Sequence, residues 1–505
     1  MQLSFFFLLI SLTFSIPVLV ISYYFLIQFL SALRYPRTLG LEYSPMDTHP
    51  LVSVLIATYN ERSVIERTLD AVEHVDYPHG RIQVIVADDS DDETREVIDR
   101  KLDALRHRGM EAVVSRRENR RGFKSGALNL ASRFLKGDYV LLLDADSTVP
   151  KDVLTRGLGA LKNDPSLSFV SYRVGHYNRE QNLSTRLFAL SQDTGDVFSK
   201  MGAYSLDLPF SLQGGFALIS AQDLKQVGYW GDDTIVEDAD LSVKLYTAGK
   251  RGIYLSDLKI MSEDPPTLGV WKKQAARVSQ GWAFCARNRF YEILNTPRLS
   301  KSKRAALLIG LLAPFASLSW IVVNFLSALS IVLRIDEPAN SIFSNPVYVG
   351  IVAVPGFSLI GSALYVLHVQ RILTLRNITI IPLLSYSSLG MITANSIGFL
   401  NGILGKSGFF FRTPKTGLNN WERQYSLSPK LDRTSIAEGV IAVAALILCI
   451  SVLRDGVWFL GFSLLAFGAL TLKSMHLSQL FSQGSRPYQT RLQQESREKS
   501  ELAVA

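Results

Sequence analysis

The chain has 505 residues, of which 48% are hydrophobic and 19% are charged, and its net charge is +8. This composition is too apolar for an ordinary soluble protein of this length. We expect no nucleic-acid partner, because the basic residues flank apolar runs or lie in the middle of the chain, where the positive-inside rule, anionic headgroups or diphosphates explain them. Cys285 and Cys449 predict neither a disulfide nor a zinc site.

Apolar residues are concentrated in a few long runs. Residues 4–30 carry no charge and lack the basic start and cleavage site of a signal peptide, so we expect 1–33 to form an N-terminal membrane anchor. A hydrocarbon core needs about 20 apolar residues in a helix. Further runs predict two transmembrane helices within 301–377 and two more within 434–475. These runs are 305–333, 346–369, 434–453 and 457–472.

The apolar run 378–404 is harder to interpret. It contains Pro382 and Asn395, and it precedes a loop, 405–433, that is rich in Lys and Arg. A basic loop is expected on the cytoplasmic side of a membrane. We therefore expect 378–433 to be an interfacial or re-entrant segment followed by a cytoplasmic loop. The chain then has five spans, and six is the alternative.

Charge beside the first apolar run sets the orientation. Arg34 and Arg37 follow this run, and no charged residue precedes it. The positive-inside rule then predicts a multi-pass protein of the cell membrane, with domain 34–300 and the basic tail 476–505 in the cytoplasm.

The domain between the apolar runs alternates strand-like and helix-like segments. This alternation predicts an α/β fold with a mainly parallel sheet that is covered on both faces. We expect Asn60 to cap the first helix. The expected strands are 51–57, 82–87, 112–115, 139–143, 168–172, 217–220 and 253–256, and the expected helices are 61–75, 91–105, 122–134, 151–161, 183–198, 238–247 and 268–294.

Clusters of acidic residues follow two of these strands. Asp88 and Asp89 end one apolar strand, and Asp144 and Asp146 end another. Open α/β sheets bind ligands at the carboxyl ends of their strands. Carboxylates bind phosphate poorly unless a divalent metal lies between them. In a membrane protein, this pattern indicates sugar transfer from a nucleotide diphosphate.

Seven segments in one order resemble family 2 glycosyltransferases of the membrane-embedded branch, which includes cellulose, mannan and hyaluronan synthases and ceramide glucosyltransferases. The resemblance covers residues 50 to about 430 and implies a GT-A-type nucleotide-binding domain inserted between transmembrane helices. The segments are Thr58 to Glu61, Asp88 to Ser90, Arg121 to Asn129, Asp144 to Asp146, Val236 to Leu241, Gln274 with Arg277, and Phe410 to Lys415 with Gly417.

The resemblance implies a binding site for the nucleotide sugar. The residues that it assigns to the nucleobase, ribose, sugar and diphosphate are Thr58, Tyr59, Glu61, Asp88, Asp89, Lys124, Asp144, Gln274 and Arg277. Each motif also has a purely structural interpretation. A helix start explains Thr58 to Glu61, a favourable helix dipole explains the acids after Asp88, and a surface lysine explains Lys124.

The resemblance also implies the groups that act on the sugar. Asp146, with Asp144, is the expected ligand of Mg²⁺ or Mn²⁺. Asp238 is the expected catalytic base, with Glu237 on the acceptor side. One base that takes the proton of the acceptor hydroxyl is sufficient for an inverting transfer. The alternative is an ordinary acidic helix N-terminus.

The chain departs from the family pattern at the acceptor. Val278 replaces a tryptophan that stacks on the acceptor sugar in the family. Trp282 lies one helical turn further on, and it could supply that ring, pack in the core or anchor the helix at the membrane interface. Thr413 and Lys415 match the start of a gating loop that closes over the nucleotide; a basic segment beside the membrane is the alternative.

These observations together predict an inverting, metal-dependent glycosyltransferase at the cytoplasmic membrane face. We expect a UDP-sugar rather than a GDP-sugar as donor, and processive synthesis of a polysaccharide. The alternative is addition of one or a few sugars to a membrane lipid. A transporter with a regulatory domain is disfavoured, because the apolar runs contain almost no ionisable residues.

Overall fold

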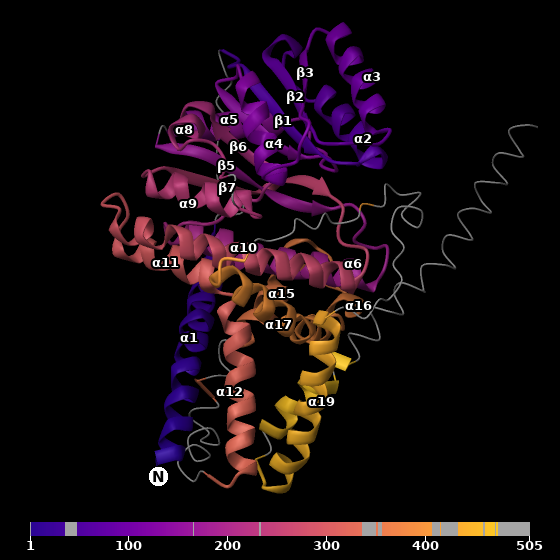
Figure 1. The fold of residues 1–505 in the computed structure, drawn as a ribbon. Helices are drawn as coiled ribbons and strands as arrows, with labels where there is room; N and C mark the ends of the chain where they lie inside the picture. The colour runs from indigo at the N-terminus through magenta and orange to yellow at the C-terminus, as the bar shows by residue number, and fades with distance from the viewer. Residues whose placement is uncertain are drawn as a thin grey trace, which may run out of the picture.

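The computed structural model describes residues 2–35, 48–164, 166–231, 234–335, 350–351, 356–406, 415, 433–457, 460–469 and 471–472. An α/β domain lies at one end of the molecule, and helices α1, α12 and α19 extend from the other (Figure 1). Helices α6, α10 and α11 lie between these two parts.

A seven-stranded sheet forms the centre of the α/β domain, with strand order β3-β2-β1-β4-β6-β5-β7. The strands β1 to β4 are parallel, β5 is parallel to β7, and β6 runs antiparallel to both β4 and β5. This mainly parallel GT-A-type sheet confirms the predicted fold class. The strands are β1 (Val52–Thr58), β2 (Ile82–Asp88), β3 (Glu111–Arg116), β4 (Tyr139–Asp144), β5 (Leu167–His176), β6 (Phe216–Ser220) and β7 (Arg251–Ser262).

Successive residues of the central strands pack into two different hydrophobic clusters. Val54 and Val84 belong to the cluster on one face of the sheet, and Leu55 and Ile85 belong to the cluster on the other. Both faces are therefore buried, as an apolar run without alternation predicts for parallel strands. The covering helices are α2 (Arg62–Glu73), α3 (Thr94–His107), α4 (Phe123–Ala131), α5 (Val153–Asn163), α8 (Ala221–Gln226) and α9 (Glu237–Thr247).

The register brings the acidic strand ends to one edge of the sheet. Thr58 of β1 pairs with Asp88 of β2, and Ala57 pairs with Asp144 of β4. Asn60 follows β1 with a φ of 55°, but it does not cap α2 as expected, because the N-cap is Glu61. Asn60 Nδ2 instead donates to Asp91 Oδ1 at 2.6 Å and so ties the loop after β1 to the loop after β2.

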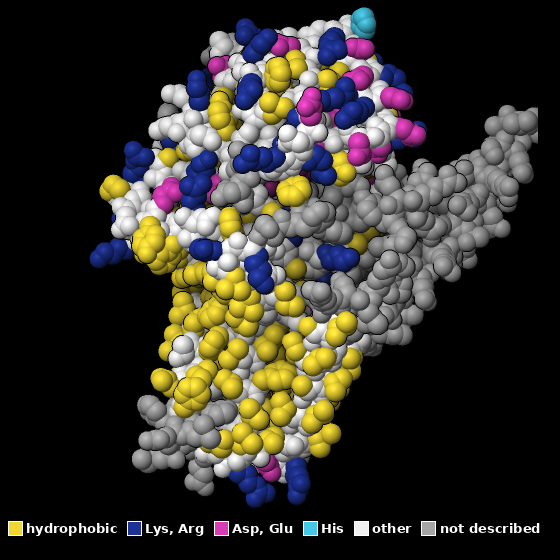
Figure 2. All heavy atoms as spheres, viewed as in Figure 1, with side chains coloured by type: hydrophobic (Ala, Val, Ile, Leu, Met, Phe, Trp, Pro, Cys, Tyr) yellow, Lys and Arg dark blue, Asp and Glu magenta, His cyan; other side chains and the backbone are white. Residues whose placement is uncertain are grey.

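Four helices in the described part of the chain are long and apolar enough to cross a membrane, as expected for an integral membrane protein. They are α1 (Gln2–Ala32), α12 (Phe315–Val332), the stretch Leu375–Ile403 that contains α17 (Ile381–Ile403), and α19 (Arg433–Arg454). Shorter apolar helices are α15 (Gly356–Val369) and 460–469. Figure 2 shows apolar side chains over this part and charged side chains over the α/β domain.

The apolar run 305–333 is not one helix. It divides near Pro314 into α11 (Lys301–Leu312) and α12, and Leu307 and Leu311 of α11 pack into a hydrophobic cluster of the α/β domain. Proline lacks the N–H that would continue the first helix, which explains the break. Only α12 of this run is a candidate span.

Helix α17 packs closely along α10 (Leu268–Asn295). A Cβ at Gly398 would lie 2.3 Å from the Ala276 carbonyl oxygen, and one at Gly402 would lie 2.2 Å from that of Gln280. More than half of the apolar window of α17 is buried in the protein, against less than a third for each of the other three candidates. The interfacial or re-entrant placement of 378–404 stays a prediction.

Candidate functional site

A cavity of about 510 Å³ lies at the carboxyl edge of the sheet. Its wall is built by the ends of β1 and β4, the start of α9, the first half of α10, and α6 (Leu183–Asp196) with the π-helical segment η3 (Val197–Gly202). Most of the predicted site residues line it: Thr58, Tyr59, Glu61, Asp89, Lys124, Asp144, Asp146, Glu237, Asp238, Gln274, Arg277, Trp282 and Lys415. Thr413 lies outside the described residues.

Asp88 is a predicted site residue that does not line the cavity. Its side chain is buried, and its carboxylate accepts from Arg116 Nε at 2.8 Å and from the Ser90 backbone N–H at 3.0 Å. Asp88 therefore holds the loop after β2, and its neighbour Asp89 faces the cavity. Arg117 donates to both oxygens of Asp89 at 2.7 Å.

One end of the cavity offers a flat, charged surface. The guanidinium of Arg120 lies 3.3 Å from the centre of the Tyr59 ring, which is a cation–π contact. The same guanidinium lies 3.7 Å from Asp89. Tyr59 and Asp89 were predicted to lie at this site, whereas Arg117 and Arg120 were not. The basic run before Gly122 was their only sequence signal.

Lys124 bridges two acids at the centre of the cavity. Its ammonium lies 2.6 Å from Asp144 Oδ1 and 2.7 Å from Glu237 Oε1. Burial lowers the pKa of Lys124, but the charges of Asp144 and Glu237 outweigh burial and hold the pKa above its usual value. Gly215 allows this close packing, because a Cβ there would lie 2.5 Å from Asp144 Cγ.

Asp238 lies next to this bridge at the start of α9. Its carboxylate accepts from the Gly214 N–H at 3.0 Å and from the Ala239 N–H at 2.8 Å. Burial and the adjacent Glu237 carboxylate raise the pKa of Asp238 to about 6. A half-buried carboxylate with this pKa is ionised at neutral pH and still basic enough to accept a proton.

Asp240, another carboxylate of α9, forms an ion pair with α10. Arg289 of α10 donates to its two oxygens at 2.8 and 3.2 Å. Asp240 is buried in this ion pair and does not line the cavity. Asp238 is thus the acid of α9 that combines cavity exposure with a raised pKa.

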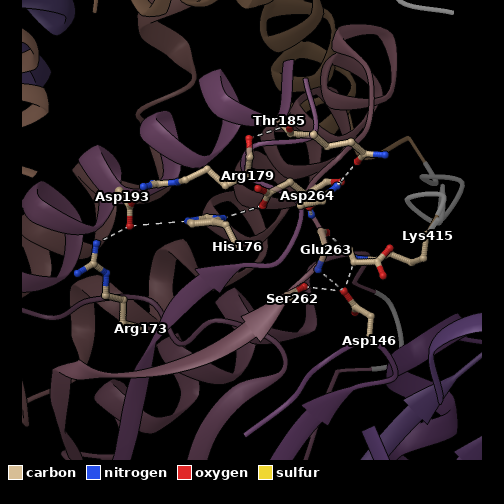
Figure 3. Close-up of polar contacts among 12 residues, drawn as sticks. Asp146, Arg173, His176, Arg179, Thr185, Asp193, Ser262, Glu263, Asp264 and Lys415 are labelled. Atoms are coloured by element: carbon tan, nitrogen blue, oxygen red, sulfur yellow. Dashed lines mark hydrogen bonds and ion pairs between the residues drawn. The ribbon is translucent and has the colours of Figure 1, made fainter. Parts of the chain in front are cut away.

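Asp146 is held at the cavity edge by a set of donors that Figure 3 shows. Its Oδ2 accepts from Ser262 Oγ at 2.7 Å, from the Glu263 N–H at 2.8 Å and from Lys415 Nζ at 2.8 Å. Lys415 also donates to the Glu263 carbonyl oxygen at 3.0 Å. Burial raises the pKa of Asp146, but Lys415 and the other donors outweigh it, so the pKa is lowered.

The two carboxylates of the Asp144–Asp146 motif fit a divalent cation only in part. Within the described ranges, no group of three His, Cys, Asp or Glu side chains could hold a metal ion. Asp144 and Asp146 supply hard oxygen ligands, which Mg²⁺ and Mn²⁺ accept together with phosphate oxygens and water. The donor set therefore fits a metal that is completed by a bound diphosphate.

A buried charge network continues from this edge through His176 to Asp193 (Figure 3). His176 Nδ1 lies 2.7 Å from Asp264 Oδ1, and its Nε2 lies 3.7 Å from Asp193 Oδ1. Arg173 pairs with Asp193 at 2.6 Å, and Gln370, just after α15, donates to it at 2.7 Å. Burial lowers the pKa of His176, but the two carboxylates outweigh it and raise the pKa to about 9. No motif of the sequence predicted this network.

Helix α10 contributes the predicted diphosphate and acceptor residues. Arg277 Nη1 donates to the Ile235 carbonyl oxygen at 3.0 Å and so supports the loop before α9. The side-chain oxygen of Gln274 is buried and has no hydrogen-bond partner in the described part of the chain. Trp282 lines the cavity and also packs against the hydrophobic cluster that contains Val236.

The chain is similar in sequence to known glycosyltransferases. Residues 53–227 match the model of the family described as Glycosyl transferase family 2, so the chain contains a domain of that family, as the resemblance predicted. "Glucomannan 4-beta-mannosyltransferase 7" of Arabidopsis thaliana is 31% identical over 261 residues, which are 51% of this chain and 47% of the relative. "Glucomannan 4-beta-mannosyltransferase 1" of Oryza sativa subsp. japonica is 29% identical over 259 residues, half of each chain.

The chain spans about half the length of the curated relatives that it matches. Among solved structures, the mannosyltransferase PcManGT from Pyrobaculum calidifontis, in complex with GDP-Man and Mn²⁺, aligns with a TM-score of 0.48 and 21% identity over 79% of this chain and 99% of that chain. The relatives are mannosyltransferases, so the comparisons do not support the expected preference for a UDP-sugar over a GDP-sugar.

Proposed function

We propose that this chain is an inverting glycosyltransferase that transfers mannose from GDP-mannose to a growing glycan. The observation that carries the proposal is Asp238, a raised-pKa carboxylate that faces the same cavity as Lys124 and the Asp144–Asp146 motif. The names of the curated relatives support mannose as the sugar and a glucomannan-like polysaccharide as the product.

The donor occupies the cavity from the base end to its centre. The nucleobase lies by Tyr59, Glu61 and Asp89, and Thr58 lines the start of the same groove. The diphosphate lies near Lys124 and Arg277, whose cationic groups neutralise its charge. Asp144 then faces the sugar. Asp144 and Asp146 would hold a divalent cation, which would supply further charge neutralisation at the leaving diphosphate.

Asp238 performs the proton transfer. Its carboxylate takes the proton of the acceptor hydroxyl while the hydroxyl oxygen forms a bond to the anomeric carbon. The bond between that carbon and the diphosphate oxygen breaks, and the electron pair leaves with the diphosphate. The attack from the opposite face inverts the anomeric centre. No acid is needed, because the leaving group is already stabilised by cations.

Lys415 supports a role for the loop after α17. Its ammonium contacts Asp146, one of the proposed metal ligands, from a position far along the chain. A loop that reaches the donor site can exclude water during transfer and reopen for product release. Together with the candidate spans, this favours a processive synthase in the cell membrane with its catalytic domain in the cytoplasm. Transfer to a membrane lipid is the second candidate.

A donor panel tests the proposal. The purified full-length chain in detergent is incubated with Mn²⁺ or Mg²⁺ and either GDP-mannose, GDP-glucose or UDP-glucose, and release of the nucleotide diphosphate is measured. We expect GDP-mannose to be turned over fastest. Turnover of UDP-glucose with no turnover of GDP-mannose would refute the assigned donor.

A further inference from the structure

The cavity that Asp238 lines has a further wall to which the proposed donor site assigns no residue. This wall is one face of α6 and of the π-helical segment η3, and it includes Phe188, Gln192, Asp196 and Lys200. Their spacing of four residues places them in a stripe along one side of the helix. π-Helical turns are rare and frequently occur at functional sites.

Two members of the stripe are charged and buried. Asp196 and Lys200 are each 4% exposed, and their oxygen and ammonium lie 3.2 Å apart. Lys200 also donates to the side-chain oxygen of Gln213. Removing both charges from water costs free energy that a single ion pair offsets only in part. Well-packed apolar residues in place of such a pair are often as stable, so stability alone does not account for the two charges.

The stripe is connected to the proposed base. Gln213 precedes Gly214, whose N–H donates to Asp238 Oδ2 at 3.0 Å. Lys200 therefore bonds to the same turn that holds Asp238, and both side chains line the same cavity.

A structural role explains the presence of only some of the four residues. Asp196 accepts from the Tyr254 hydroxyl at 3.1 Å, which stabilises the domain. The side-chain amide of Gln192, however, lines the cavity and makes no hydrogen bond or ion pair within the part of the chain that the structure describes. The Phe188 ring is held edge-on by Trp271 of α10, with centroids 5.4 Å apart, and it lines the cavity too.

We propose that Phe188, Gln192, Asp196 and Lys200 form the subsite for the terminal pyranose ring of the acceptor. This inference rests on the proposed function and deepens it. The ring of Phe188 receives an apolar sugar face. It thereby takes the role of the family's tryptophan, in whose place this chain has Val278. The amide, carboxylate and ammonium provide the mixed donors and acceptors that sugar hydroxyls require. A polar subsite of this kind selects a glycan acceptor over the hydroxyl of a simple lipid.

The test uses Gln192→Leu and Lys200→Met in the full-length chain. Transfer from GDP-mannose to a β-1,4-linked mannose tetramer is measured against tetramer concentration, and donor hydrolysis is measured without the tetramer. We expect the KM for the tetramer to rise about tenfold, which corresponds to about 1.4 kcal/mol. The rate of donor hydrolysis should change far less than this KM. Gln222→Leu and Lys225→Met, on the exposed side of α8, are matched controls and should behave as the wild type.

Two results would overturn the subsite. One is an unchanged KM for the tetramer in both variants. The other is an equal loss of tetramer transfer, donor hydrolysis and GDP affinity, which would indicate damage to the fold or to the donor site. If the wild type neither transfers nor hydrolyses GDP-mannose, the proposed function fails instead. Direct binding of the tetramer, measured by calorimetry, then decides the subsite: binding that is weakened in both variants supports it, and absence of binding refutes it.

Discussion

Replacing the proposed base separates catalysis from binding. Asp238→Asn preserves the shape of the side chain and one of its two hydrogen bonds to backbone N–H groups, so the fold and the donor affinity should persist. An amide cannot accept the proton of the acceptor hydroxyl. A general base contributes roughly 10²–10⁴-fold to a rate, and we expect kcat to fall within that range.

The pH profile gives a second, independent test of the same group. Asp238 has a pKa of about 6, so it is ionised at higher pH and protonated below. The rate of the wild type should therefore fall about tenfold for each pH unit below about 6. Glu237→Gln removes the neighbouring negative charge that raises this pKa, and the acid limb should move to lower pH. In Asp238→Asn the limb should vanish.

Steady-state turnover of GDP-mannose between pH 4.5 and 8, with GDP binding measured at each pH, provides the readout. Asp240→Asn is the matched control. It weakens the ion pair with Arg289 and should lower thermal stability, but it should leave the acid limb in place. Near-normal turnover in Asp238→Asn, or loss of the acid limb in Asp240→Asn alone, would refute the assignment of the base.

Other features of the site lead to further predictions. Excess chelator should abolish turnover, and Asp146→Asn should weaken GDP-mannose binding as well as the rate; full turnover in chelator would exclude the metal. Lys415→Ala should slow turnover more than it weakens GDP binding, because the loop contributes mainly when it is closed. A larger loss of GDP affinity than of turnover would assign Lys415 to nucleotide binding alone. A cysteine at Ser428 should be labelled by a membrane-impermeant reagent only from the cytoplasmic side, and labelling only from outside would establish six spans. His176→Asn should lower the melting temperature most at pH 6, where His176 is protonated, and by progressively less as the pH rises from 6.5 through its folded pKa of about 9. In that window the folded protein holds a proton that the unfolded chain has lost, so raising the pH removes the stabilisation; a pH-independent effect would contradict this.

The sheet and its acidic edge could be predicted because both depend on local sequence. Apolar strands such as 139–143 are recognisable by their composition, and parallel pairing brings their carboxyl ends together. Lys124 and Asp238 were found through the family resemblance. The break in the run 305–333 was missed although Pro314 marks it, because hydropathy alone cannot distinguish a packed helix from a span.

The interactions that sequence analysis missed join residues that are distant in the chain. His176 pairs with Asp264, and Lys415 reaches Asp146, through tertiary packing that no local pattern records. Asn60 resembles an N-cap residue, but its side chain pairs with Asp91 once β1 and β2 lie side by side. Lys200 lies beyond the expected helix 183–198, and only the tertiary structure places it at the cavity wall.

The configuration of the product tests the central mechanism most directly. The sugar of GDP-mannose is α-linked to the diphosphate, so a single displacement assisted by Asp238 inverts the anomeric carbon. Proton NMR of the tetramer extended with GDP-mannose should show a new β-linked mannose. A new α-linked mannose would contradict the single base, because retention requires a different mechanism.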